Sequence, residues 1–189
     1  MDGKISRLAV TVTARPDGWE VDVTNRHSAD MQLWGQAPMA HQPQVALRWP
    51  RITVTVRGDQ ALRHLVLLDN PAFSIAAPRP QLTSRLTETL APPQPLTAAQ
   101  QQALRLLYAE LLAWPPLRQA VPLRIKQVAR QLGIGPEAVR RRLEEARQKA
   151  YALGLGRDLP LSDPEYLHVL VRAGYLMPTD DEIDPILRG

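Results

Sequence analysis

The chain changes its hydrophobic period once, and this change restricts its possible folds more than any other feature. Up to about residue 70, apolar residues alternate with polar ones, as Ile52, Val54 and Val56 do around two threonines. A period of two is typical of strands that bury one face. From about residue 96, apolar residues recur every three or four positions, which is typical of amphipathic helices. The sequence therefore predicts an α+β protein with strands first and helices second.

Proline content divides the chain into three predicted parts. Six of the 18 prolines lie between Pro71 and Pro95, in a stretch with little periodicity. Such a stretch is typical of an extended, semi-stiff linker. We therefore expect an antiparallel, β-sandwich-like domain of about six strands over residues 1–70. The linker is expected over 71–95, and an all-α domain over 96–189.

The second half carries signals for the beginning and end of each helix. Thr97 and Gln100 form a predicted capping box, and the helix that they open is expected to run to Trp114 before Pro115-Pro116 stops it. Further helices are predicted over 124–132, over 136–153, from Asp163-Pro164 to Gly174, and near 180–187. Acidic residues cluster at the end, and we expect them to form a solvated acidic C-terminal tail: Asp180, Asp181, Glu182 and Asp184.

A tight turn between two of these helices indicates a helix-turn-helix. Gly133 can supply the positive φ that a short interhelical turn requires, and Pro136 suits the first turn of the next helix. Ala129 is small enough to let the helices cross closely, while Val139 and Leu143 would face the first helix. This arrangement would leave a basic stripe on the outer side of the second helix, made of Arg140, Arg141, Arg142, Arg147 and Lys149.

We interpret this helix pair as a DNA-contacting surface. Residues 124–149 hold eight basic residues against three acidic ones, in a chain whose formal net charge is +4. Arginine and lysine neutralise phosphates, and arginine also reads guanine edges in the major groove. The residues expected to contact DNA are Arg124, Lys126, Glu137, Arg140, Arg141, Arg147 and Lys149. Of these, Glu137, Arg140 and Arg141 should lie nearest the base edges.

A second interpretation uses the same residues without DNA. Glu137–Arg141, Arg140–Glu144 and Arg141–Glu145 are spaced to pair one turn apart and could neutralise the arginines within the helix. The helical half would then dock on another protein. The chain would be a protein-interaction adaptor in a kinase or ATPase signalling system, with no DNA binding.

Residues 96–155 resemble the helix-turn-helix of sigma-factor region 4 and of related bacterial regulators. The resemblance depends on Ala129, Leu132-Gly133-Ile134, Val139 and Leu143. It implies that the helix beginning at Pro136 is the recognition helix.

The strand half resembles the second part of a forkhead-associated (FHA) domain, over Ile5–Val12, Asp17–Val21 and Asn25–Gly35. That family binds phosphothreonine peptides through loops at one end of a β-sandwich. The resemblance implies that Ser6 and Arg7 would contact the phosphate. It also implies that Asn25 and Ser28, on a later loop, would contact the peptide.

The chain departs from the family pattern at three places. Ala9 stands where the family has a structural histidine, and Asp30 stands where it has an asparagine. The resemblance also begins at the Ser-Arg signature, so the opening strands and their phosphate-binding arginine are expected to be absent. The alternative is a partial sandwich that serves as a scaffold or a protein-interaction surface.

Composition excludes several kinds of site. The absence of cysteine rules out disulfides, thiolate metal sites and cysteine nucleophiles. The four histidines show no metal-ligand spacing, and the sequence has no acid–base pair or phosphate-binding glycine loop. We therefore expect no metal, no cofactor and no enzymatic activity. Without a signal peptide or an apolar span, a cytoplasmic protein is expected. The preference for arginine over lysine suggests a bacterial, high-GC genome.

These observations predict a signal-responsive regulator, most directly of transcription. Its β domain would bind a protein partner, including one that carries phosphothreonine, while its basic helix binds DNA.

Overall fold

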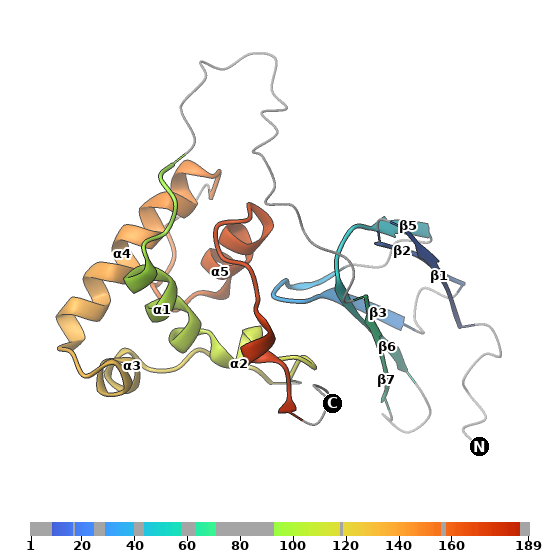
Figure 1. Cartoon of the computed structure of the whole chain (residues 1–189), viewed down its shortest axis with the longest axis horizontal. Coiled ribbons are helices and arrows are strands. Elements are labelled where there is room, and N and C mark those ends of the chain that lie inside the picture. The colour runs from blue at the N-terminus through green and yellow to red at the C-terminus, as the bar shows by residue number, and fades with distance from the viewer. Residues whose placement is uncertain are drawn as a thin grey trace, which may run out of the picture. The chain divides into compact units, whose positions relative to one another are not determined.

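The described residues form two antiparallel sheets and five α-helices, which confirms the predicted α+β class. The structure is a computed structural model that describes residues 9–16, 18–24, 29–39, 44–57, 63–70, 93–117, 119–155 and 158–185. The chain divides into two compact units, Met1–Ala76 and Ala77–Gly189, which are treated separately below. Figure 1 shows that strands make up the first unit and helices the second.

The first unit contains seven described strands in two sheets. A three-stranded sheet has the order β1-β2-β5, and a four-stranded sheet has the order β4-β3-β6-β7. All neighbouring strands run antiparallel. The strands are β1 (Val10–Arg15), β2 (Gly18–Val23), β3 (Ala29–Leu33), β4 (Pro38–Met39), β5 (Gln44–Leu47), β6 (Arg51–Arg57) and β7 (Arg63–Asp69).

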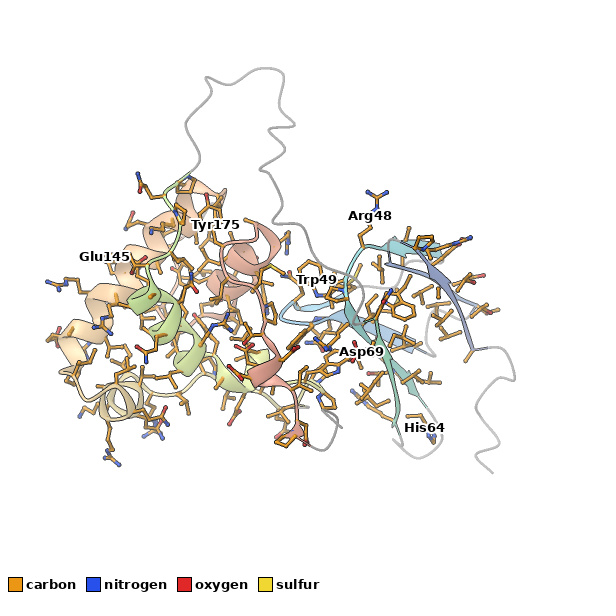
Figure 2. The ribbon with its side chains drawn as sticks, in the orientation of Figure 1. Arg48, Trp49, His64, Asp69, Glu145 and Tyr175 are labelled. Carbon is orange, nitrogen blue, oxygen red and sulfur yellow. The ribbon has the colours of Figure 1, made fainter. Side chains whose placement is uncertain are left out.

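The two sheets share one hydrophobic core. Val21 from β2 and Ile52 and Val54 from β6 are among its fully buried members, as the period of two predicts. Two tryptophan side chains tie the loops to this core. The Nε1–H of Trp19 donates to the carbonyl of Trp49 at 3.0 Å, and the Nε1–H of Trp49, which Figure 2 labels, donates to the carbonyl of Trp34 at 3.0 Å.

Strands β1 and β2 form a tight hairpin, in which Arg15 pairs with Gly18. Gly18 has a φ of 141°, and a Cβ added to it would lie 2.2 Å from the carbonyl oxygen of Leu47. Only glycine fits a position with both this backbone conformation and this close approach. The sequence predicted about six strands, and seven are described. The additional strand is β4, whose two residues are too few for a hydrophobic period to be recognised.

The second unit contains the five α-helices. They are α1 (Ala98–Leu107), α2 (Ala109–Leu112), α3 (Ile125–Leu132), α4 (Pro136–Ala152) and α5 (Pro164–Arg172), followed by a single 3₁₀ turn, η2 (Asp180–Glu182). The capping box at Thr97 and the Asp163 N-cap of α5 both form as predicted. Helix α1 contacts α3 and α4, and α5 packs on α4.

The helix predicted from Thr97 to Trp114 is instead divided at Tyr108. The carbonyl of Leu107 would accept from the amide of Leu111 in an unbroken helix, but it accepts from the amide of Leu123 at 2.7 Å. The amide of Leu111 turns to the carbonyl of Tyr108 at 2.9 Å. A backbone contact from a distant loop therefore breaks the helix, which its own periodicity does not indicate.

The prediction of a solvated acidic tail is corrected by the structure. Ile183 is buried and forms a parallel bridge with Trp114. The amide of Trp114 donates to the carbonyl of Glu182 at 2.9 Å, and the amide of Asp184 donates back to the carbonyl of Trp114 at 2.8 Å. A helix was expected near 180–187, and within the described residues of this segment Asp180–Glu182 form a 3₁₀ turn. The segment 180–184 is therefore docked on the helical unit, although three of its carboxylates face solvent.

Helix α3 ends in a Schellman motif at Gly133, whose φ is 65°. The amide of Gly133 donates to the carbonyl of Arg130 at 3.3 Å, and the amide of Ile134 donates to that of Ala129 at 3.1 Å. Helix α4 begins three residues later at Pro136, and Gly135 is its N-cap. The turn that the sequence predicted is therefore present.

We expect Gly133→Ala to lower the free energy of unfolding of the helical unit by about 1 kcal/mol, because an alanine is strained at a positive φ. A Cβ at Gly133 meets nothing within 4 Å, so the backbone conformation is the only source of this cost. Urea unfolding followed by circular dichroism would measure it. Gly135→Ser is the control, since Gly135 is equally open but has a φ of −70° and stands at the N-cap of α4, where serine is a preferred residue. Equal effects of the two substitutions would contradict the argument.

Candidate nucleic-acid interface

Helices α3 and α4 meet at the turn Gly133–Gly135 and bury small or branched residues between them. Val128 and Ala129 on α3 and Val139 and Leu143 on α4 are all buried. The sequence predicted three of these four positions from their spacing. The remaining sides of the two helices carry the basic residues.

The basic residues of α4 do not form one stripe as predicted. Successive residues turn by roughly 100° around a helix axis. The buried side of α4 holds Val139, Leu143, Ala146 and Ala150, so Arg141 points directly away from the core. Arg140 and Arg147 then lie on one flank of the helix, and Arg142 and Lys149 lie on the other. The five basic side chains therefore point in three different directions.

Ion pairs between residues of α4 itself form on the solvent-facing side of this helix. Arg140 pairs with Glu137, and Arg141 Nε lies 3.9 Å from Glu145 Oε1. The Arg141–Glu145 pair confirms a prediction. The expected Glu137–Arg141 and Arg140–Glu144 pairs are replaced by i,i+3 pairs, because Glu137 contacts Arg140 and Glu144 contacts Arg147. The side chain of Arg141 remains 80% exposed.

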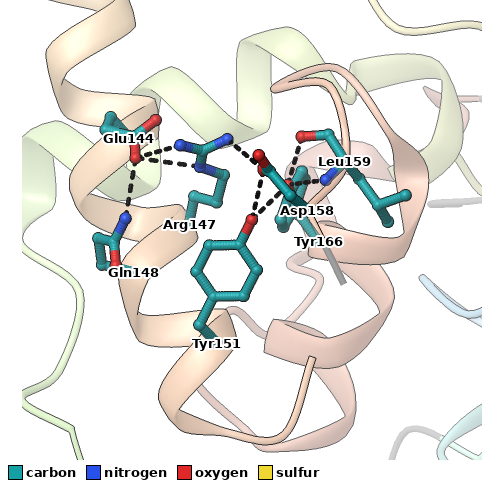
Figure 3. A network of polar contacts seen from close by, with 7 residues as sticks. All are labelled: Glu144, Arg147, Gln148, Tyr151, Asp158, Leu159 and Tyr166. Atoms are coloured by element: carbon teal, nitrogen blue, oxygen red, sulfur yellow. Dashed lines mark hydrogen bonds and ion pairs between the residues drawn. The ribbon is translucent and has the colours of Figure 1, made fainter. Parts of the chain in front are cut away.

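Arg147 belongs to an internal network rather than to an open surface (Figure 3). Its guanidinium binds Glu144 on α4, and its Nη1–H donates to Asp158 Oδ1 at 2.9 Å in the loop that follows. The hydroxyl of Tyr151 donates to the same oxygen of Asp158 at 2.6 Å. The hydroxyl of Tyr166 on α5 accepts from the amide of Leu159 and donates to the carbonyl of the same residue.

Hydrogen bonds in this network shift the pKa values of Glu144, Arg147 and Tyr151. Burial raises the pKa of the Glu144 carboxyl, but hydrogen bonds from Arg147 and Gln148 outweigh it and leave this pKa below its usual value. The hydrogen bond to Glu144 raises the pKa of Arg147. The hydrogen bond to Asp158 raises the pKa of the Tyr151 hydroxyl. The contacts of Arg147 with Glu144 and Asp158 link α4 to the loop that leads to α5, so Arg147 has a structural role here.

Lys149 also binds within the helical unit. Its Nζ donates to the carbonyl of Pro95 at 2.6 Å and to Gln100 Oε1 at 3.0 Å. The side chain of Gln100 in turn donates to Glu145 Oε2 at 2.9 Å. Lys149 thus fastens the beginning of α1 to α4, a role that only tertiary structure reveals.

The remaining predicted cations are exposed around the turn. Arg124 precedes α3, and Lys126 lies on the solvent side of that helix. Arg130 shares this side one turn later; the sequence analysis did not select it, although the apolar positions of α3 already placed it outward. We call Arg124, Lys126, Arg130, Arg140 and Arg141 together the basic turn surface. Three members of this surface precede the turn, namely Arg124, Lys126 and Arg130. Among the described residues, no carboxylate lies within ion-pair distance of these three side chains.

The candidate phosphopeptide residues Ser6, Arg7, Asn25 and Ser28 lie outside the described residues. Two positions beside them are described. Ala9 is buried, and its carbonyl accepts from the amide of Thr24 at 3.2 Å. The carboxylate of Asp30 pairs with Arg57, whose Nη2 lies 2.7 Å away.

Other kinds of site find little support in the described part of the chain. No group of three His, Asp or Glu residues there could hold a metal ion. An open depression of about 450 Å³ lies between the end of α4 and α5, and Glu165, Arg172 and several apolar residues line it. Among the helices that the structure describes, none has both the length and the apolar character needed to cross a bilayer.

Comparison with protein-family models, with curated proteins and with solved structures gives no match to this chain.

Proposed function

We propose that the helical unit binds duplex DNA through the basic turn surface, as a helix-turn-helix in which α4 enters the major groove. The observation that carries this proposal is the exposure of Arg124, Lys126 and Arg130 on or just before α3, the helix that precedes α4, with no described carboxylate paired to them. Arg124 just before α3 and Lys126 and Arg130 on it are thus three exposed cations with no described carboxylate partner, and such a set suits a polyanion.

The ion pairs on α4 do not oppose this proposal. Exposed intrahelical pairs contribute only about 0.3–0.5 kcal/mol each, because water screens them. A guanidinium–phosphate contact is charge-assisted, and DNA binding also releases counterions. Arg140 and Arg141 can therefore exchange Glu137 and Glu145 for phosphates or base edges at small cost. Glu137, 81% exposed at the first turn of α4, can accept a hydrogen bond from a cytosine amino group.

The structure also narrows the proposed contact set. Arg147 and Lys149 hold α4 against its neighbours, so we leave them out of the interface and add Arg130. Within the whole chain, the β unit would supply the signal-responsive part as an FHA-like, protein-binding module, and the chain would regulate transcription. That part of the proposal depends on the sequence resemblance alone.

We expect the full chain to bind duplex DNA with an affinity that falls steeply as salt rises. Arg130→Ala combined with Arg141→Ala should weaken binding about tenfold or more and reduce the salt slope by roughly two, since each lost phosphate contact removes about one unit of slope. Fluorescence anisotropy of a labelled duplex over a salt series would measure both quantities.

The matched control is Arg48→Ala combined with Arg172→Ala, which removes the same charge from two exposed arginines, one between β5 and β6 and one on α5, that do not belong to the basic turn surface. An equal loss of affinity in this control would show binding by net charge alone and overturn the assigned surface. If the parent chain fails to bind duplex DNA at low salt, the DNA proposal is wrong and the adaptor interpretation takes its place.

A further inference from the structure

Strand β7 lies at the edge of the four-stranded sheet (Figure 1). It spans Arg63–Asp69 and pairs along its whole length with β6. No other described strand pairs with its outer side. Figure 2 labels His64 and Asp69 near the two ends of this strand. An unpaired edge presents a row of backbone donors and acceptors that can bind another strand.

The middle of β7 exposes apolar side chains on both faces. Val66 pairs with Val54, which is 1% exposed in the shared core, yet Val66 itself is 43% exposed. Leu65 pairs with Thr55 on the opposite face and is 47% exposed. The core of the β unit therefore reaches solvent at this edge, on the side where a further strand would cover it.

The strand also lacks the usual protection of a sheet edge. Natural edge strands carry lysine, proline, a bulge or an inward-pointing charge that prevents pairing. In β7 the charged residues Arg63 and Asp69 stand only at the ends, and the register with β6 has no bulge. The edge strand of the other sheet, β1, differs because its exposed side chains include Thr11 and Thr13.

The charge pattern of β7 is complementary to itself in the antiparallel direction. Arg63 and Asp69 stand at equal distances on either side of Val66. A two-fold axis at Val66 would place each Arg63 opposite Asp69 of the second copy, and each Leu65 opposite Leu67. Paired residues fall on the same face, so the apolar positions would also meet. Asp69 already contacts Arg51 at 3.2 Å and remains 45% exposed, so its carboxylate can bridge two arginines.

We propose that the chain forms a symmetric dimer in which β7 pairs antiparallel with β7 of a second copy, centred on Val66. The two four-stranded sheets then become one continuous sheet, and the exposed parts of Val66 and Leu65 are covered. A second copy is favoured over an unrelated strand because it supplies an opposite charge at both ends of β7 without any further requirement. This inference does not depend on DNA binding.

Light scattering coupled to size exclusion should find a dimer for the full chain and a monomer, or at least a tenfold weaker dimer, for Val66→Lys. A lysine there points a charge into the joined core. Thr13→Lys, which adds the same charge at the other sheet edge, should remain dimeric. A monomeric parent chain at high concentration, or an unchanged dimer in Val66→Lys, would overturn the proposal.

A cysteine substitution tests the register and does not require a destabilised variant. The chain has no cysteine, so Val66→Cys places one thiol per copy on the proposed axis. Residues directly opposite in an antiparallel pair lie about 4.5–5.5 Å apart at Cα, within the range of a disulfide. Mild oxidation should therefore convert Val66→Cys to a covalent dimer, whereas Thr13→Cys should stay largely monomeric on a non-reducing gel. Equal cross-linking of the two variants would contradict the assigned register.

Discussion

Arg105→Ala is expected to lower the free energy of unfolding of the helical unit by about 3 kcal/mol, because it leaves a largely buried carboxylate without its cation. Arg105 on α1 binds Glu182, whose side chain is 12% exposed, and its Nη2–H donates to the carbonyl of Met177 at 2.6 Å. Arg105 contacts Oε1 of the Glu182 carboxylate, and the other oxygen, Oε2, accepts from the hydroxyl of Thr179 at 3.0 Å. Thermal and urea unfolding would measure the loss.

Two variants separate this arrangement from a general effect of charge. Arg105→Lys keeps the positive charge but not the two-pronged contact, so we expect an intermediate loss. Arg172→Ala removes an exposed arginine from α5 and should change stability by less than about 0.5 kcal/mol. If Arg105→Ala unfolds at the same urea concentration as the parent, the contacts of Arg105 with Glu182 and Met177 contribute nothing to stability and our account of them is wrong.

This docking also shows where sequence reasoning stops. The period of two, the capping box at Thr97, the Asp163 N-cap and the Gly133 turn were all predicted correctly, because each depends on residues close together in the sequence. Arg105 and Glu182 are 77 residues apart. An acidic cluster alone looks like a solvated tail, and only its distant partners show that it is held.

The candidate interface shows the same division. The spacing of the apolar residues, together with Gly133 and Pro136, predicted α3, the turn and α4. The same spacing predicted that Arg140 and Arg141 face solvent. It did not separate these arginines from Arg147 and Lys149, because local charge does not reveal that Asp158, Pro95 and Gln100 come within hydrogen-bond distance. The choice between i,i+3 and i,i+4 ion pairs was also beyond the sequence, since both spacings bring side chains together on a helix.

Tyr108→Phe is expected to lower the stability of the helical unit by about 2 kcal/mol at neutral pH. Tyr108 is 0% exposed, and its hydroxyl donates to the carbonyl of Asp163 at 2.8 Å and lies 3.1 Å from that of Leu161. Removing it leaves two carbonyls at the beginning of α5 without this donor, and an unsatisfied buried group costs about 1–3 kcal/mol. Chemical unfolding of both proteins would measure the difference.

The same hydroxyl gives this difference a pH dependence. Burial raises the pKa of Tyr108 above its ordinary value of 10.0, and Asp163 and Tyr166 act in the same direction. Above about pH 10 the unfolded chain loses this proton while the folded chain keeps it, so the stabilisation is complete below that pH and decreases as pH rises. The advantage of the parent over Tyr108→Phe should therefore shrink in alkali, and the other tyrosines cancel because both proteins share them.

Tyr175→Phe provides the control for the size of the effect. Its hydroxyl donates one hydrogen bond, to the carbonyl of Pro93 at 2.6 Å, and the residue is only partly buried. Because water can reach that carbonyl in the variant, we expect a loss of about 1 kcal/mol or less. If Tyr108→Phe costs no more than Tyr175→Phe, the paired carbonyls of Leu161 and Asp163 find other donors. If its cost stays constant from neutral to alkaline pH, the Tyr108 hydroxyl does not hold its proton more tightly in the folded chain.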